Sequence, residues 1–193
     1  AYNIPAVLFF NKIELCDEED RWLLRALGDV YRNVGYTCLA VSAETGEGVE
    51  EVKQLLQDKV SVFSGQSGVG KSSLINRIEP ELTLKTAKIS EMHDTGKHTT
   101  TFAEMFELSF GGYIVDTPGI RAFGLVHMEK NEISHYFPEI FKYAEDCRYY
   151  NCTHIHEPGC AVLEAVKEGK ISETRYFSYV SMFEEETEKY RKG

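Results

Sequence analysis

The chain has 193 residues, a formal net charge of −10, 42% hydrophobic residues and 12% aromatic residues. This length allows one full domain with a smaller addition, and the composition favours a packed core over a disordered chain. The sequence contains no apolar run of about 18 residues and no visible signal peptide, so nothing in it argues for a membrane-bound or exported protein.

The first predicted strand, 5–10, ends in the polar run Asn11-Lys12-Ile13-Glu14. This run looks like the guanine-reading N-K-x-D of GTPases, with Glu14 where aspartate is usual. Guanine selectivity needs a carboxylate that accepts hydrogen bonds from N1–H and N2–H₂ of the base. Because Glu14 is one methylene longer than aspartate, we expect a small backbone shift and a lower guanine affinity or selectivity than usual.

The second predicted strand, 36–41, follows a helix predicted over 17–33 and ends in Ser42-Ala43. This pair resembles the S-A-K loop of GTPases, whose alanine N–H meets the guanine O6. Glu44 stands where lysine is usual and adds negative charge nearby. Since both base-reading elements end consecutive strands, the sequence favours GTP over ATP.

A glycine-rich loop follows the third predicted strand, 59–64, which comes after a helix predicted over 48–57. The loop fits the phosphate-binding pattern G-x-x-x-x-G-K-[ST], and helical spacing continues over 71–78. A strand–loop–helix aims backbone N–H groups and a helix N-terminus at an anion. Lys71 would reach the β- and γ-phosphates, and Ser72 would ligate Mg²⁺. The predicted nucleotide-binding residues of the loop are Gly65, Gln66, Ser67, Gly68, Val69, Gly70, Lys71, Ser72 and Ser73.

Two more strands are predicted over 101–108 and 112–115, after a polar, turn-rich stretch at 79–97. The last strand runs into D-T-P-G, which begins at Asp116 and ends at Gly119. An acidic residue at the end of a second strand is the usual partner of a phosphate loop and holds Mg²⁺ directly or through water. Gly119 would offer its N–H to the γ-phosphate and act as a switch hinge.

Four potential metal ligands lie close together beyond these strands. Cys147, Cys152, His154 and Cys160 form C-x₄-C-x-H-x₅-C, which includes three of the five cysteines. Thiolate and imidazole ligands at such spacings suit a closed tetrahedral Zn²⁺ site, with His156 as a spare imidazole. Four protein ligands leave no open position, so the predicted role is structural. Clustered cysteines without a secretory signal also favour a reducing cytoplasm.

The order of these motifs is unusual, because the base-reading elements precede the phosphate loop, whereas an ordinary GTPase runs the other way. A permuted chain can build the same sheet because termini tend to lie close together at the surface. With this order, the segment G-K-H-T-T-T over 96–101 and the cysteine/histidine pattern, nearly the whole chain resembles the RsgA (YjeQ) family of circularly permuted GTPases.

The resemblance implies that G-K-H-T-T-T is the first switch. Thr100, with Thr99 as the second choice, would complete the Mg²⁺ shell together with Ser72 and Asp116. Ile120 stands where Ras-like proteins place a glutamine that orients water, so His98 is our candidate for that task. We expect slow hydrolysis by the chain alone and acceleration by a partner.

The resemblance also implies GTP and GDP, the small ribosomal subunit and its rRNA as partners of a monomeric protein. The charge of −10 is awkward for contact with RNA, whose phosphates attract a basic surface. Two explanations stay open. Either a local patch faces the RNA, or a part of the protein outside this sequence is basic. Members of the family carry an N-terminal OB-fold and one more strand before this point, so we expect the native protein to be longer. The local patch would comprise Lys85, Lys88, Lys97, Arg121 and Arg148.

The expected fold is α/β, a P-loop NTPase of three layers with a small α-helical zinc-binding domain. Residues 1–126 would form the permuted GTPase domain and 127–193 the zinc-binding domain, which ends in a helical tail at about 160–190. The leading functional hypothesis is a GTP hydrolase in small-subunit maturation. A nucleotide-dependent binding module with negligible hydrolysis is the alternative, and a P-loop kinase is disfavoured because it has no use for the base-reading strands.

Overall fold

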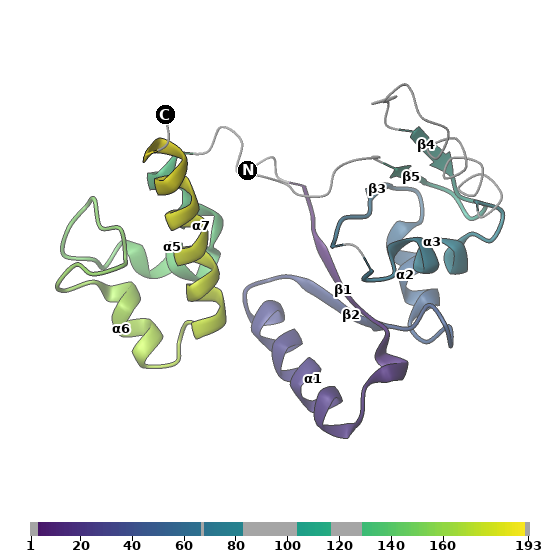
Figure 1. Cartoon of the computed structure of the whole chain (residues 1–193), viewed down its shortest axis with the longest axis horizontal. Coiled ribbons are helices and arrows are strands. Elements are labelled where there is room, and N and C mark those ends of the chain that lie inside the picture. The colour runs from purple at the N-terminus through teal and green to yellow at the C-terminus, as the bar shows by residue number, and fades with distance from the viewer. Residues whose placement is uncertain (1–3, 67, 83–103, 117–128, 192–193) are drawn as a thin grey trace. The chain divides into compact units, whose positions relative to one another are not determined.

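The computed structural model describes residues 4–66, 68–82, 104–116 and 129–191. The chain divides into two compact units (Figure 1). One covers Ala6–Phe123, and the other covers Gly124–Gly193 together with Ala1–Pro5. Each unit has its own hydrophobic core.

Parallel strand pairing brings the motifs of the first unit to common sheet edges. Strands β1 (Val7–Asn11) and β2 (Thr37–Val41) pair in parallel, with Asn11 opposite Val41. Strand β3 (Val60–Val62) pairs in parallel with β5 (Tyr113–Asp116), and β4 (Glu104–Glu107) adds to β5 in antiparallel fashion. Among the described residues the strands therefore form two sheets, β1-β2 and β3-β5-β4.

The helices of this unit begin where the sequence supplies caps or glycines. Helix α1 (Glu18–Asn33) starts with a capping box, in which the Asp20 N–H donates to Asp17 Oδ1 at 2.8 Å. Helices α2 (Val49–Leu56) and α3 (Lys71–Ile78) start after Gly48 and Gly70, both with positive φ. The predicted helices and strands of this unit all occur, and each described end lies within three residues of the predicted end.

One core unites the two sheets of the first unit. Val41, Leu74 and Ile114 are almost completely buried in it, although they come from β2, α3 and β5. Phe9 of β1 stacks on Phe63, just after β3, with ring centroids 6.0 Å apart. The core therefore holds the ends of β1 and β3 close together, and the predicted motifs follow those ends.

The second unit is helical. It contains the 3₁₀ helix η2 (Lys130–Tyr136) and the helices α5 (Pro138–Ala144), α6 (Ala161–Lys167) and α7 (Glu173–Arg191). Ile140, Val162 and Tyr179 are among the most buried side chains of its core. No helix among the described residues is long and apolar enough to cross a membrane.

The prediction of one helical tail over about 160–190 is wrong, because the segment holds two helices. Gly169 has φ 71, a left-handed conformation that ends a helix. The N–H of Lys170 donates to the carbonyl of Ala165 at 2.8 Å and closes this end. The chain then turns, so that α6 and α7 pack separately into the core.

Candidate nucleotide and metal sites

Asn11 connects the base-reading elements to the phosphate loop. Its Nδ2 donates to the carbonyl of Val69 at 3.0 Å and to that of Gly70 at 3.4 Å. Its Oδ1 accepts from the N–H of Ala43 at 3.3 Å. One amide at the end of β1 thus holds both the loop after β3 and the loop after β2. The sequence indicated Asn11 as a base-reading residue, but it gave no sign of this structural role.

Gly70 is required where Asn11 meets the loop. Its φ is 89°, a backbone conformation that residues with a Cβ rarely adopt. A Cβ added at Gly70 would also collide with Nδ2 of Asn11. The glycine therefore allows the loop to approach β1 closely and to start α3 at Lys71.

Glu14 has a carboxylate oxygen that lacks a hydrogen-bond partner. Lys12, with φ 70, turns the chain from β1 into the 3₁₀ helix η1 (Ile13–Leu15), which carries Glu14. Hydrogen bonding from the buried Ser42 side chain is the main cause that lowers the pKa of Glu14. Its Oε2 is shielded from solvent and has no partner among the described residues. To accept from the N–H donors of a guanine edge, this oxygen must turn out of its shielded position.

Lys71 is folded onto its own loop. Its Nζ donates to the carbonyl of Gly65 at 2.5 Å and to that of Gln66 at 2.7 Å. To reach a phosphate, the ammonium group must exchange these carbonyls for phosphate oxygens. Ser72 and Ser73 lie exposed in the first turn of α3, where N–H groups are without helical partners.

A cavity of about 510 Å³ runs along these elements. Asn11 at the end of β1 and Lys12 after it line the cavity on one side, and Gly68 of the phosphate loop and Lys71 of α3 also line it. Phe9, Phe63 and Leu74 add apolar walls. Its volume is within the range of about 300–1,000 Å³ that is common for small-molecule sites.

Asp116 ends β5 at the sheet edge where the phosphate loop begins. Val115 pairs with Val62 of β3, so Asp116 stands one register position beyond the last β3 residue. The pairing of β3 with β5 thus brings Asp116 to the sheet edge where the phosphate loop begins, and that loop leads to Ser72, the other predicted Mg²⁺ ligand described here. The predicted residues Ser67, His98, Thr100 and Gly119 lie outside the described residues, as do Thr99 and Ile120.

The four predicted metal ligands come together in the second unit, with all their ligand atoms within 4.8 Å of one another. Nδ1 of His154 lies 3.5 Å from Sγ of Cys147 and 3.6 Å from Sγ of Cys160. The sulfurs of Cys147 and Cys160 are 3.8 Å apart. A tetrahedral Zn²⁺ with Zn–S of about 2.3 Å and Zn–N of about 2.05 Å would set S···S at about 3.8 Å and S···N at about 3.6 Å. The ligand set therefore fits Zn²⁺. The spare His156 is exposed and does not belong to the cluster.

Ionisation of the Cys152 and Cys160 thiols is unfavourable unless a cation balances the negative charge of their thiolates. Burial is the largest cause that raises the pKa of Cys152 and of Cys160, and burial lowers the pKa of His154. Thiolates of Cys152 and Cys160 in this position would therefore need a compensating positive charge. A metal ion supplies that charge and displaces the thiol protons.

Residues outside the ligand pattern hold in place the segment 147–160, which is called the metal loop below. Glu157 accepts hydrogen bonds from the N–H groups of Thr153, Ile155 and His156 at 3.0–3.2 Å, and from the Thr153 hydroxyl at 2.5 Å. Burial works to raise the pKa of Glu157, but these hydrogen bonds outweigh burial and lower it to about 2. Glu157 was not predicted from the sequence, although it lies in a turn-rich stretch, where side-chain oxygens often accept from backbone N–H groups.

Helix α7 supports the same loop from the other side. Tyr179 OH donates to the carbonyl of Thr153 at 2.7 Å, and Tyr176 OH donates to that of His154 at 2.8 Å. Their spacing of three residues places both tyrosines on one helix face. From the sequence, this spacing could have predicted that the two tyrosines share a helix face, but not which loop they would contact.

Comparison with known proteins agrees with this geometry. A family profile described as RsgA GTPase matches residues 1–126. The chain is 54% identical over 192 residues to the small ribosomal subunit biogenesis GTPase RsgA 2 of Bacteroides thetaiotaomicron, which covers 99% of this chain and 62% of that protein. A Porphyromonas gingivalis protein named small ribosomal subunit biogenesis GTPase RsgA is 53% identical over 195 residues, with the same coverage.

Solved structures give the same result. The crystal structure of YjeQ from Thermotoga maritima matches with a TM-score of 0.77 and 40% identity, over 95% of this chain and 60% of that one. YloQ, titled a circularly permuted GTPase, matches with a TM-score of 0.75 and 31% identity, over 95% of this chain and 57% of that one. The fold is therefore the predicted α/β fold of a circularly permuted GTPase. The chain spans about 62% of the length of the curated relatives it matches. On this sequence and structural evidence, the chain belongs to the RsgA GTPase family.

Proposed function

We propose that this chain forms the GTPase and zinc-binding parts of a GTP hydrolase that acts as a nucleotide-switched factor in small ribosomal subunit biogenesis. One observation carries the GTPase proposal. Asn11 ties Ala43 to Val69 and Gly70, so the base-reading and phosphate-binding elements form a single site. A phosphate loop without a base-reading role would have no need of this connection. Relatives named as GTPases of small-subunit biogenesis support the biological role.

Each part of the nucleotide meets a different group in this proposal. The Glu14 carboxylate, with its unpartnered Oε2, accepts from the guanine N1–H and N2–H₂. The Ala43 N–H meets the guanine O6. The N–H groups of the loop from Gly65 to Ser73 surround the phosphates, and Lys71 stabilises the negative charge that develops on their oxygens.

Water would attack the γ-phosphate in line with the bond that breaks, and His98 would orient that water. Ser72, Thr100 and Asp116 would hold Mg²⁺, which neutralises phosphate charge when it is bound. The Gly119 N–H would sense the γ-phosphate. GTP would order the predicted switch segment 96–101 together with Gly119, and this ordering would control docking on the ribosomal subunit.

The second unit would bind Zn²⁺ through Cys147, Cys152, His154 and Cys160. Four protein ligands leave no position for a substrate, so the ion would stabilise the loop that contains them. We propose that residues 1–126 form the GTPase domain and 127–193 the zinc-binding domain of a monomeric, cytoplasmic protein that contacts small-subunit rRNA.

Calorimetry of GDP and ADP binding, with Mg²⁺ present, tests the nucleotide site. We expect a clear preference for GDP in the unchanged chain and a loss of roughly tenfold or more in GDP affinity for Lys71→Ala. Lys59→Ala is the matched control, because Lys59 also donates to a backbone carbonyl, that of Leu55 at 2.9 Å. Equal affinity for the two nucleotides would refute guanine reading by Glu14.

A nucleotide-dependent binding module with negligible hydrolysis is the second candidate. Ile120 favours this candidate. It directly follows the D-x-x-G motif, where Ras-like proteins place a glutamine, and its aliphatic side chain cannot orient water. Single-turnover release of phosphate from GTP separates the candidates, with and without purified small ribosomal subunits. Release that the subunits accelerate supports the hydrolase, whereas GTP that stays intact on a subunit-bound chain supports the module.

A further inference from the structure

His154 reaches the cysteine sulfurs from an unusual backbone conformation. Its φ is 58°, in the left-handed region, which residues with a Cβ adopt only at a cost in free energy. Its side chain is almost completely buried, so the backbone decides where the imidazole points. Another part of the chain must therefore hold His154 in this conformation.

The Glu157 carboxylate binds the backbone on both sides of His154. Its Oε1 accepts from the N–H of Thr153 at 3.0 Å and from the hydroxyl of the same residue at 2.5 Å. Its Oε2 accepts from the N–H groups of Ile155 and His156, both at 3.2 Å. Backbone N–H groups that converge at such a turn form a nest for an anion, and here the anion is a side chain of the same loop. Since the N–H groups converge where the chain turns at His154, Glu157 stabilises the left-handed conformation of that residue.

This position requires a carboxylate and not merely a polar side chain. Each oxygen of Glu157 accepts two hydrogen bonds, and all four come from N–H or O–H donors. A glutamine would turn its NH₂ group toward two of these donors, and an NH₂ group cannot accept from them. The match between four donors and two acceptor oxygens is therefore specific for Glu157.

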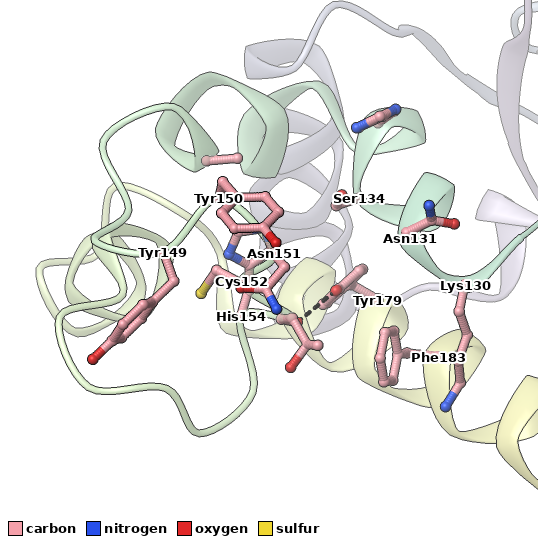
Figure 2. A pocket seen from close by; sticks show the side chains of 13 residues that line it. Lys130, Asn131, Ser134, Tyr149, Tyr150, Asn151, Cys152, His154, Tyr179 and Phe183 are labelled. Atoms are coloured by element: carbon pink, nitrogen blue, oxygen red, sulfur yellow. Dashed lines mark hydrogen bonds between the residues drawn. The ribbon is translucent and has the colours of Figure 1, made fainter.

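Helix α7 holds the carbonyl groups of the same turn. Tyr176 OH donates to the carbonyl of His154 at 2.8 Å, and Tyr179 OH donates to that of Thr153 at 2.7 Å. Figure 2 shows Tyr179 near His154, with this hydrogen bond as a dashed line. Glu157 fixes the N–H groups and α7 fixes the carbonyls, so the peptide groups next to His154 have little freedom to rotate.

The sequence offers a second imidazole for the same metal position. His156 lies two residues after His154, but it is exposed and stands outside the cluster. Its N–H is one of the four donors to Glu157, so the same carboxylate fixes the backbone of both histidines. Without that carboxylate the loop would be free to present the other imidazole, or to leave the fourth metal position to water.

We propose that Glu157 determines the fourth ligand of the metal. It holds His154 in the left-handed conformation, which places Nδ1 beside the sulfurs of Cys147 and Cys160 at 3.5 and 3.6 Å. The proposal rests on the proposed Zn²⁺ site and adds to it a positioning residue that is not a ligand. Three thiolates and a water would be an open coordination, as in catalytic zinc sites, so Glu157 also keeps the site closed.

Replacement of Zn²⁺ by Co²⁺ tests the proposal, because the visible absorption of Co²⁺ depends on its ligands and geometry. Glu157→Ala should shift the spectrum of bound Co²⁺ away from that of the unchanged chain. It should also lower Zn²⁺ affinity by about 10- to 100-fold, measured by competition with a chelator. Glu157→Gln should act in the same direction. Thr153→Val should have a smaller effect, because it removes only the hydroxyl donor.

Two control variants accompany these measurements. Glu164→Ala removes a carboxylate that is 62% exposed on α6 and pairs with Lys167, so it should keep the spectrum and the Zn²⁺ affinity. His156→Ala should keep them as well, because the N–H of residue 156 remains. Loss of the spectrum in His156→Ala overturns the proposal. An unchanged spectrum and affinity in Glu157→Ala also overturns it.

A further variant covers the case in which Glu157→Ala does not fold. Tyr176→Phe keeps the ring and removes only the hydroxyl that holds the His154 carbonyl. If Tyr176→Phe and Glu157→Gln both bind Zn²⁺ as tightly as the unchanged chain, the proposal is wrong.

The same preparations distinguish this inference from the proposed function. An unchanged chain that binds neither Zn²⁺ nor Co²⁺ refutes the proposed metal site and this inference with it. A spectrum of three thiolates and one imidazole that survives Glu157→Ala refutes only the role of Glu157. GDP binding by each variant tests the proposed GTPase site separately.

Discussion

Asn11→Asp tests whether one amide joins the base-reading and phosphate-binding elements. The change keeps the size of the side chain, so it creates no cavity. It also keeps an oxygen that can accept from the Ala43 N–H, as Oδ1 does now at 3.3 Å. It replaces the Nδ2 donor, however, by an oxygen that faces the carbonyls of Val69 and Gly70 at 3.0 and 3.4 Å.

The expected cost follows from these contacts. One well-formed and one long hydrogen bond are lost, each worth about 0.5–1.5 kcal/mol. Oxygen–oxygen repulsion adds to this, although the Val69 contact is exposed and solvent weakens it. We expect the free energy of unfolding to fall by about 2 kcal/mol and GDP affinity to fall by about thirtyfold.

Urea denaturation and calorimetric GDP binding measure the two effects. Gln54→Glu is the control, since Gln54 is exposed on α2 and the change adds the same charge. The carboxyl introduced by Asn11→Asp donates only when it is protonated, so its pKa in the folded protein should be raised. The loss of stability should therefore be small at acidic pH and should grow as the pH rises through that pKa. If Asn11→Asp binds GDP as tightly as Gln54→Glu does, the connecting role of Asn11 is refuted.

The other predictions concern the base, the loop, a buried ion pair and the metal. Glu14→Gln should lower GDP affinity and raise affinity for xanthosine diphosphate, because an amide N–H can donate to the C2 carbonyl of xanthine. An unchanged GDP preference in calorimetry would exclude Glu14 from base reading. Gly70→Ala should abolish GDP binding, since a Cβ collides with Asn11, and retained binding would show that the loop can move away. Glu139→Ala should lower the free energy of unfolding in urea denaturation, because it removes the carboxylate that now lies 2.6 Å from the buried Arg175, whereas the double variant Glu139→Met/Arg175→Leu should recover most of that stability. Removal of zinc by a chelator should release the metal loop, seen as new reactivity of Cys152 toward a thiol reagent, and zinc return should restore protection.

The sequence alone was sufficient to predict the described helices and strands of the first unit. Alternating apolar strands and helices, with a glycine-rich loop between 59–64 and 71–78, predicted where β3 and α3 lie. Phosphate-loop chemistry depends on backbone conformation over a few consecutive residues, so it can be read from a short pattern. The spacing of the four predicted metal ligands likewise restricts them to one segment, and the structure brings their ligand atoms together.

Contacts between distant segments could be decided only by the tertiary structure. Asn11 and Gly70 are 59 residues apart, and no local pattern shows that the amide of one closes on the loop of the other. The support of the metal loop by Tyr179 likewise depends on packing, because its hydroxyl donates to the carbonyl of Thr153, 26 residues away. Local propensity and motif spacing are carried by neighbouring residues, whereas these contacts form only when the core brings remote residues together.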